Sequence, residues 1–175
     1  MKIKLETWEL EMAYQVGIRR DSANAGKADA AYYDKSRMED NLRASVAAAA
    51  CELAVAKATC CYWTASVWDS SQHYKFKDLP DVLPNLEVRR VRSPGSPLVI
   101  RDKERRLDRV TVLAYTDIDD WCREVDVIGW ITAQVGWSVG TTPGWDTTNK
   151  CREVPQELLS SIQDLQVEDL VSVGV

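Results

Sequence analysis

The sequence contains a single histidine, His73, and its five cysteines include no Cys-x-x-Cys pair. Structural zinc sites need four Cys or His ligands, usually in spaced pairs, so this composition argues against one. A Ser-His-Asp triad built on His73 has no other support in the sequence. We therefore expect the cysteines to be reduced and mostly buried thiols.

Long apolar runs are also missing: no stretch approaches the roughly 18 residues that a membrane helix needs. The first residues, Met1 to Trp8, alternate charged and apolar side chains, which is not the pattern of a signal peptide. We therefore expect a cytoplasmic protein without a membrane partner. Internal repeats and glycine-rich phosphate-binding motifs are absent as well.

The 175 residues, of which 45% are hydrophobic and 28% charged, indicate one globular domain with its own core. The net charge of −5 argues against non-specific binding of nucleic acid. Residues 87–109, however, carry eight Lys or Arg against four Asp or Glu, whereas residues 110–175 carry three against eleven. This asymmetry fits either ordinary solvated surface charge or a phosphate-facing centre with an acidic flank for a partner.

Hydrophobic periodicity predicts a mixed α/β fold: a central mixed β-sheet with one long alanine-rich helix packed on it. We expect a single domain over residues 1–150, with its core motifs in 38–132, followed by a short helix and an acidic tail in 151–175. The strands are expected at 2–11, 60–68, 86–92, 98–101, 109–115 and 125–132. Helices are expected from about 36 to 58 and from 155 to 165, and loops at 21–34 and 133–145.

Three carboxylates stand out within this pattern. Glu52 lies beside the apolar stripe of the alanine-rich helix, Asp81 follows a proline, and Glu87 lies in the strand-like run Leu-Glu-Val-Arg. Asp81 and Glu87 are six residues apart across a Pro-Asn turn, so adjacent strands can bring them together. Mg²⁺ prefers such hard oxygen ligands. The alternative is an ordinary α/β core with scattered carboxylates, in which Glu52 is a surface residue.

At these positions the chain resembles the PD-(D/E)xK nuclease superfamily. The segment Cys51 to Lys57 resembles its first-helix glutamate motif, Pro80-Asp81 its strand aspartate, and Leu86 to Arg89 its Glu-x-Lys strand. The following runs, 98–101, 109–113 and 127–130, are similar to those of small phage-encoded members. The resemblance spans residues 38–132 and implies a restriction-endonuclease-like core.

The resemblance implies a nuclease of phage or mobile-element origin that hydrolyses nucleic-acid phosphodiesters, with Mg²⁺ or Mn²⁺ as cofactor and DNA as partner. Asp81 and Glu87 would bind the metal, Glu52 would assist, and Arg89 would hold the phosphate. Arg89 stands where the family carries Lys, and an arginine cannot deprotonate water. The side chains expected along the DNA backbone are Arg90, Arg92, Arg101, Arg105 and Arg106.

A second hypothesis assigns the same fold to a non-catalytic phage protein: a structural component, packaged cargo or a host-interaction factor. The Arg89 departure, the net negative charge and the acidic tail favour it, as do Trp137 and Trp145 in an expected loop. This hypothesis predicts a stable protein partner or virion assembly, and no metal dependence. The sequence leaves open the oligomeric state, DNA versus RNA, and endonuclease versus exonuclease action.

Overall fold

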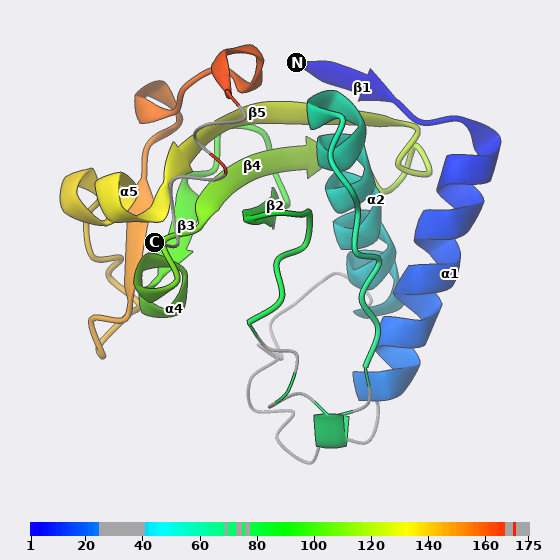
Figure 1. Cartoon of the computed structure of the whole chain (residues 1–175), viewed down its shortest axis with the longest axis horizontal. Helices are drawn as coiled ribbons and strands as arrows, with labels where there is room; N and C mark the ends of the chain where they lie inside the picture. Colours follow the sequence, from blue (N-terminus) through cyan, green and yellow to red (C-terminus); the bar gives the residue numbers. More distant parts are fainter. Residues whose placement is uncertain (25–40, 69, 73–74, 76–77, 167–169, 171–175) are drawn as a thin grey trace.

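The computed structural model describes residues 1–24, 41–68, 70–72, 75, 78–166 and 170. It is a mixed α/β structure with a four-stranded sheet in the order β1-β5-β4-β2 and a separate two-stranded sheet, β3-β6 (Figure 1). In the larger sheet β2 runs parallel to β4, whereas β4–β5 and β1–β5 are antiparallel. The strands are β1 Lys2–Lys4, β2 Leu86–Val91, β3 Leu98–Arg101, β4 Val110–Thr116, β5 Glu124–Thr132 and β6 Cys151–Val154. The mixed sheet is thus as the sequence predicts.

Two long helices cover one face of this sheet, where the sequence predicts one. The alanine-rich helix α2, Asn41–Thr59, packs on the strands, and α1, Thr7–Asn24, packs against α2 (Figure 1). The two helices approach closely at Gly17, where an added Cβ would lie 2.6 Å from the Cα of Val46. The missing side chain of Gly17 therefore allows the two helix backbones to come together.

Two hydrophobic cores lie on opposite faces of the larger sheet, and β4 contributes to both. Val110, Val112 and Ala114 join the core beneath α1 and α2, whereas Leu113 joins a smaller core. That smaller core is built with residues of β3, β5, α5 and β6. The alternation follows the two-residue period of a strand, so alternate residues of β4 face the larger core and Leu113 faces the smaller one.

The N-terminal region differs from its prediction. The expected strand 2–11 is limited to Lys2–Lys4, and the helix Thr7–Asn24 replaces both the rest of that strand and the beginning of the loop expected at 21–34. The buried positions of α1 include Glu9, Ala13 and Gly17, at steps of four residues. This stripe contains one charge and two small residues, so it gives almost no hydrophobic signal.

Other segments differ in smaller ways. The expected strand 60–68 contributes only an isolated bridge between Trp63 and Val82, and Cys60 and Ala65 adopt positive φ angles that interrupt an extended run. The predicted loop 133–145 begins with helix α5, Ala133–Val139, whose Val135 N–H donates to the Thr132 hydroxyl.

The charged segment at 102–108 and the C-terminal region also differ from their predictions. The charged connection at 102–108 contains the short helix α4, Asp102–Arg106. The expected helix 155–165 is replaced by two 3-10 turns, Gln156–Leu158 and Ile162–Asp164, preceded by the unforeseen strand β6. The helix start expected near residue 36 lies outside the described residues, as does nearly all of the tail.

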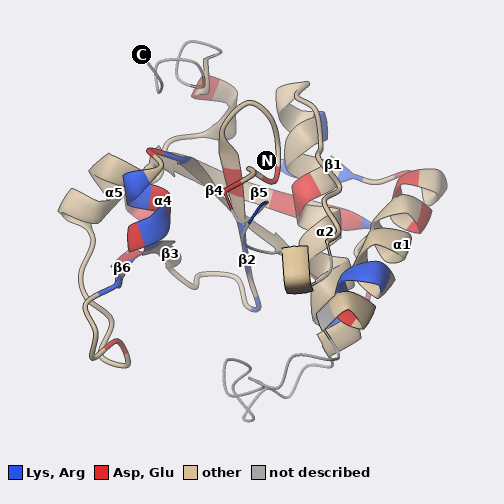
Figure 2. Ribbon diagram, turned by 60° about the horizontal axis from the view of Figure 1, so that its bottom comes forward, with Lys and Arg blue, Asp and Glu red and all other residues tan. Residues whose placement is uncertain are grey.

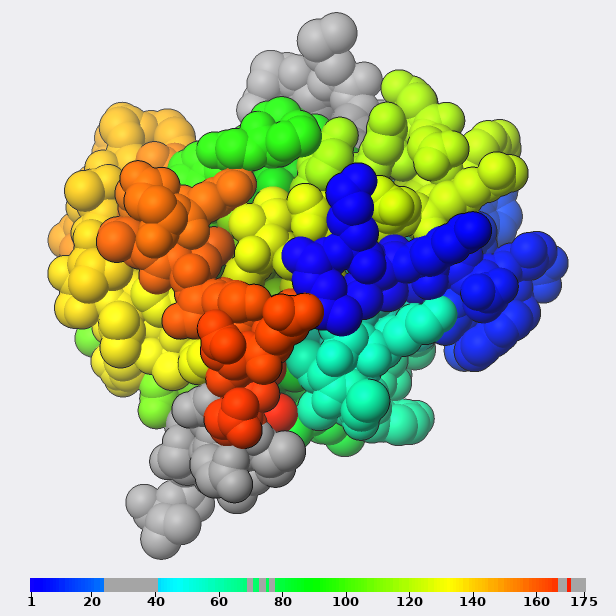
Figure 3. Space-filling model, turned by 90° about the horizontal axis from the view of Figure 1, so that it is seen from above, coloured from blue at the N-terminus to red at the C-terminus, as the bar shows by residue number. Residues whose placement is uncertain are grey.

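Both ends of the described chain lie along β5. β1 pairs with β5 at Val125, and Ser160 forms two reciprocal backbone hydrogen bonds of 2.9 Å with Trp130. Figure 3 shows the N-terminal strand and the C-terminal turns beside one another on the surface. Among the described helices, none has the length and apolar character needed to cross a membrane.

Candidate carboxylate site

The candidate site lies at β2, the edge strand of the larger sheet. A tight turn returns the chain so that Val82 pairs with Leu86 through hydrogen bonds of 2.9 and 3.1 Å. Asp81, one residue before this bridge, accepts a 2.9 Å hydrogen bond at Oδ2 from the backbone N–H of Val88. The turn therefore fixes Asp81 beside Glu87, as the spacing in the sequence suggests.

Glu52 and Glu87 both influence the ionisation of Asp81. Burial raises the pKa of the Asp81 carboxyl group well above its usual range, and the carboxylates of Glu52 and Glu87 raise it further. The Val88 N–H and the charge of Arg89 act in the opposite direction but are weaker. Carboxylates from α2 and from β2 thus both act on Asp81, which lies in the turn between them.

Glu52 is held by an unforeseen ion pair. Its Oε1 lies 2.6 Å from Arg20 Nη1 and its Oε2 lies 2.8 Å from Arg20 Nη2, so the pair is bidentate. The indole Nε1 of Trp63 donates a further hydrogen bond of 2.9 Å to Oε2. Glu52 is 5% exposed. Both of its oxygens are therefore already bonded, and the reading of Glu52 as a surface residue is wrong.

Arg89 is bonded to two carboxylates on the other face of the sheet. Its Nη2 contacts Oε1 of Glu104, which is on α4, and lies 3.2 Å from Oε1 of Glu87. Burial lowers the pKa of Arg89, but the charges of Glu87 and Glu104 outweigh that effect and the net shift is upward. Glu104 is 1% exposed and also accepts from the backbone N–H of Arg101. Arg89 is therefore placed to orient the carboxylate of Glu87. This role fits its contacts better than the phosphate binding expected from the sequence.

The arginines expected along DNA do not share one environment. Arg90 points to the face of β2 opposite Arg89 and is partly buried, while Arg105 and Arg106 form ion pairs with Asp102. Figure 2 shows these basic residues on β2 and α4, interspersed with acidic ones. The exposed members of the predicted set are Arg92, Arg101 and Arg106.

The donor set fits a metal site of two protein ligands. In the part of the chain that the structure describes, no three His, Cys, Asp or Glu side chains form a cluster able to hold a metal ion. Glu52 is saturated by Arg20 and Trp63, which leaves Asp81 and Glu87 with free acceptor capacity. Mg²⁺ is commonly bound by one or two carboxylates together with water and substrate phosphate, so this pair suits it.

Sequence reasoning missed Arg20, Trp63 and Glu104. Arg20 lies in α1, at a position between the strand expected at 2–11 and the loop expected at 21–34, and Glu104 lies in the charged segment 102–108. Trp63 lies in the aromatic run 60–68, which was expected to form a strand but contributes only an isolated bridge. None of the three has a local sequence signal for its role, because each bonds a residue at least 11 positions away.

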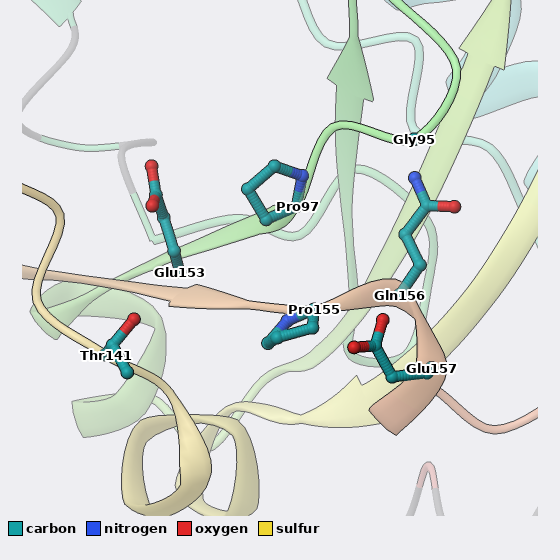
Figure 4. A pocket seen from close by; sticks show the side chains of 7 residues that line it. All are labelled: Gly95, Pro97, Thr141, Glu153, Pro155, Gln156 and Glu157. Carbon is teal, nitrogen blue, oxygen red and sulfur yellow. The ribbon is translucent and has the colours of Figure 1, made fainter.

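Two hollows lie apart from the carboxylate site. Figure 4 shows one beside the β3–β6 sheet, where Glu153, Gln156 and Glu157 surround Pro97 and Pro155. A larger, mainly apolar groove runs between α1, α2 and residues 118–123. Neither is lined by Glu52, Asp81, Glu87 or Arg89.

Trp137 and Trp145, expected together on an exposed loop, are in different environments. Trp137 is half-buried on α5, with the guanidinium groups of Arg105 and Arg152 at 5.0 and 4.4 Å from its ring centre. Trp145 is 64% exposed. The cation–π contacts give Trp137 a structural role.

No family model, curated protein or solved structure matches the chain. The assignment of a function therefore depends on the geometry of the residues described above.

Proposed function

We propose that the protein is a nuclease-like phosphodiester hydrolase of phage or mobile-element origin that uses Mg²⁺ or Mn²⁺ and acts on DNA. The observation that supports it is the placement of Asp81 beside Glu87, with the pKa of Asp81 raised by burial and by neighbouring carboxylates. Perturbed carboxyl groups of this kind concentrate at functional sites. A divalent cation would relieve the repulsion among them.

Each residue has a distinct part in this proposal. Asp81 and Glu87 hold the metal, which when bound polarises the scissile phosphate and acidifies a water molecule. Arg89 orients Glu87 from the Glu104 side. The exposed Arg92, Arg101 and Arg106 contact the backbone of the nucleic acid.

Cleavage of labelled oligonucleotides tests the proposal directly. Single- and double-stranded DNA and RNA are incubated with wild type, Asp81→Asn and Glu87→Gln in Mg²⁺ or Mn²⁺. We expect each substitution to lower cleavage by roughly 100-fold or more, because each removes a metal ligand and the loss of a residue that only orients such a ligand already costs about 10–100-fold. Glu153→Gln, the same change in a carboxylate outside the site, is the matched control. Unchanged cleavage by both site variants contradicts the proposal.

A second candidate is a non-catalytic phage structural, cargo or host-interaction protein on a nuclease-like fold. The bonding of Glu52 to Arg20 and of Arg89 to Glu104 favours it, because much of the site is neutralised by the protein itself. It predicts a stable protein partner. Ligands that bind the folded state raise apparent stability, so a melting temperature unmoved by millimolar Mg²⁺ and Mn²⁺ favours this candidate. Co-purification with DNA but with no protein counts against it.

A further inference from the structure

Two adjacent cysteines, Cys60 and Cys61, form a pair of free thiols at the protein surface. All five cysteines lie within the described residues, and of these only Cys60 is exposed, while Cys61 is partly buried. Cys51 and Cys122 are fully enclosed in the core. Free cysteines are usually buried and inert, so an exposed thiol with a second thiol beside it is a candidate for chemistry.

The thiol pair stands where α2 ends. The N–H of Cys60 donates to the carbonyl of Lys57 at 3.4 Å. The N–H of Cys61 donates to the carbonyl of Ala56 at 3.0 Å, which completes the pattern of a Schellman cap. Cys60 has a φ of 54° and occupies the left-handed position of this cap that glycine usually takes. A cysteine is therefore an unfavourable residue for ending the helix, and its thiol is what glycine would lack.

The residues that follow the thiol pair are bonded to the turn that carries Asp81. The backbone oxygen of Tyr62 accepts a 2.9 Å hydrogen bond from the N–H of Leu83. Thr64 donates two hydrogen bonds to the backbone oxygen of Asp81, at 3.1 Å from its N–H and at 2.9 Å from its hydroxyl. A change in the backbone at the thiol pair therefore reaches Asp81 through its hydrogen-bonded neighbours.

We propose that the thiol pair is a reversible oxidation site, which a small disulfide such as oxidised glutathione converts into a disulfide between Cys60 and Cys61. The exposed thiolate of Cys60 first attacks one sulfur of the oxidant, so that a mixed disulfide forms and one glutathione thiolate leaves. The thiolate of Cys61 then attacks the Cys60 sulfur and expels the second glutathione. The two protein thiols lose two protons and two electrons, and the oxidant is reduced to two glutathione thiols.

Adjacency governs both the formation and the reduction of this disulfide. The second thiol is tethered to the first, so the closing step is intramolecular and has a high effective concentration. Neighbouring Cα atoms are about 3.8 Å apart, below the usual roughly 4.4–6.8 Å of disulfides, so the closed ring is strained. Strained and exposed disulfides are the easily reduced, regulatory ones. The site does not depend on the proposed hydrolase activity, although it adjoins the turn that carries Asp81.

Intact-protein mass spectrometry tests the site. The full chain is incubated with oxidised glutathione, the remaining thiols are blocked with iodoacetamide, and peptide mapping locates the modified residues. We expect wild type to lose two hydrogen atoms at the thiol pair, and a thiol reductant to restore them. Cys61→Ser should stop at one glutathione attached to Cys60, because the second thiol is missing. Cys151→Ser, which changes a partly buried cysteine outside the pair, is the matched control and should react as wild type does.

Removal of the exposed thiol gives the complementary test. Cys60→Ser should lose the reaction, because the first attack starts at this sulfur. If Cys60→Ser does not fold, Cys60→Gly replaces it, since glycine suits the positive φ at this position. The indole N–H of Trp63, which donates to Glu52, supplies a second readout. Its NMR resonance, assigned with Trp63→Phe, should shift when wild type is oxidised and stay in place in the Cys60 variant.

Three results overturn the proposal: wild type that remains reduced, wild type that stops at the glutathione adduct, and wild type that forms a covalent dimer. The same loss of two hydrogen atoms in Cys60→Gly also overturns it, because the disulfide then joins other cysteines. A Trp63 resonance that stays in place in the oxidised wild type contradicts the transmission toward Asp81. None of these measurements involves metal or nucleic acid, so their failure is distinct from that of the proposed hydrolase.

Discussion

The flanks of the carboxylate site and its centre are bonded in opposite ways. On one face of the sheet Glu52 is paired with Arg20, and on the other Glu104 is paired with Arg89; both glutamates are almost fully buried. Between them, Asp81 accepts one hydrogen bond among the described residues, from a backbone N–H to Oδ2, and its pKa is raised. Removing the partner of a buried charge is costly, so the two flanks are tied to the fold, whereas a carboxyl group whose pKa is strongly raised is a candidate for function.

The largest effect is expected on the Glu104 flank. Glu104→Ala removes the closer of the two carboxylates paired with Arg89 and also the acceptor for the Arg101 N–H. We expect the free energy of unfolding to fall by about 3–5 kcal/mol, the usual cost of breaking a buried pair. Urea denaturation followed by tryptophan fluorescence measures it, with the exposed Glu157→Ala as control. A loss similar to that of the control would show that this flank is not structural.

The contribution of Asp81 to folding stability should decrease as the pH rises. An aspartate whose pKa is lowered in the folded state has the opposite dependence. Because the pKa of Asp81 is raised in the folded state, the folded chain binds more protons there than the unfolded chain. This contribution to stability therefore decreases as the pH rises above the unfolded pKa of about 3.9. Asp81→Asn should melt higher than wild type at pH 7, and its advantage should shrink as the pH falls toward 4.

Asp146 supplies the contrast for this pH measurement. Its pKa is lowered, first by the hydrogen bond from the Thr148 side chain and also by backbone N–H groups. Asp146→Asn should therefore melt lower than wild type at pH 7, with the deficit shrinking as the pH falls. Melting temperatures of both variants between pH 4 and 8 check the two signs. A constant difference between Asp81→Asn and wild type would remove the electrostatic argument for the site.

A half-exposed ion pair should matter least. Lys57 Nζ lies 2.7 Å from Oε2 of Glu9 and 3.1 Å from the carbonyl of Lys4, and it remains partly hydrated. Glu9 is 5% exposed, but glutamine can still donate a hydrogen bond to its carboxylate, so we expect Lys57→Gln to cost about 1–2 kcal/mol, and less in high salt. Denaturation in low and high salt measures this, and Lys4→Gln removes a matched exposed charge. A cost comparable with that of Glu104→Ala would mean that exposure does not separate the pairs.

Much of the sheet can be predicted from the sequence, because its strands carry strong local signals. The runs that form β2, β3, β4 and β5 are rich in β-branched residues, and the alternation in β2 also places Leu86 and Val88 opposite Glu87 and Arg89. The turn before Leu86 likewise suggests that Asp81 and Glu87 are neighbours. The metal and catalytic roles of these residues remain predictions.

The remaining features depend on contacts that local pattern does not encode. The buried stripe of α1 lacks large apolar side chains, so its helical period is hidden. Glu104 lies in a highly charged segment and yet is 1% exposed, because Arg89 on β2 pairs with it. Arg20 and Glu52 are 32 positions apart, and no helical or strand period links them.

The close approach at Gly17 has an evolutionary consequence. Arg20 lies one turn further along α1, so the same contact that seats Gly17 on Val46 also brings Arg20 within reach of Glu52. A larger residue at position 17 would displace α1 and increase the distance between Arg20 and Glu52. Among relatives of this chain, substitutions at position 17 should therefore covary with position 46 in volume, and with positions 20 and 52 in charge.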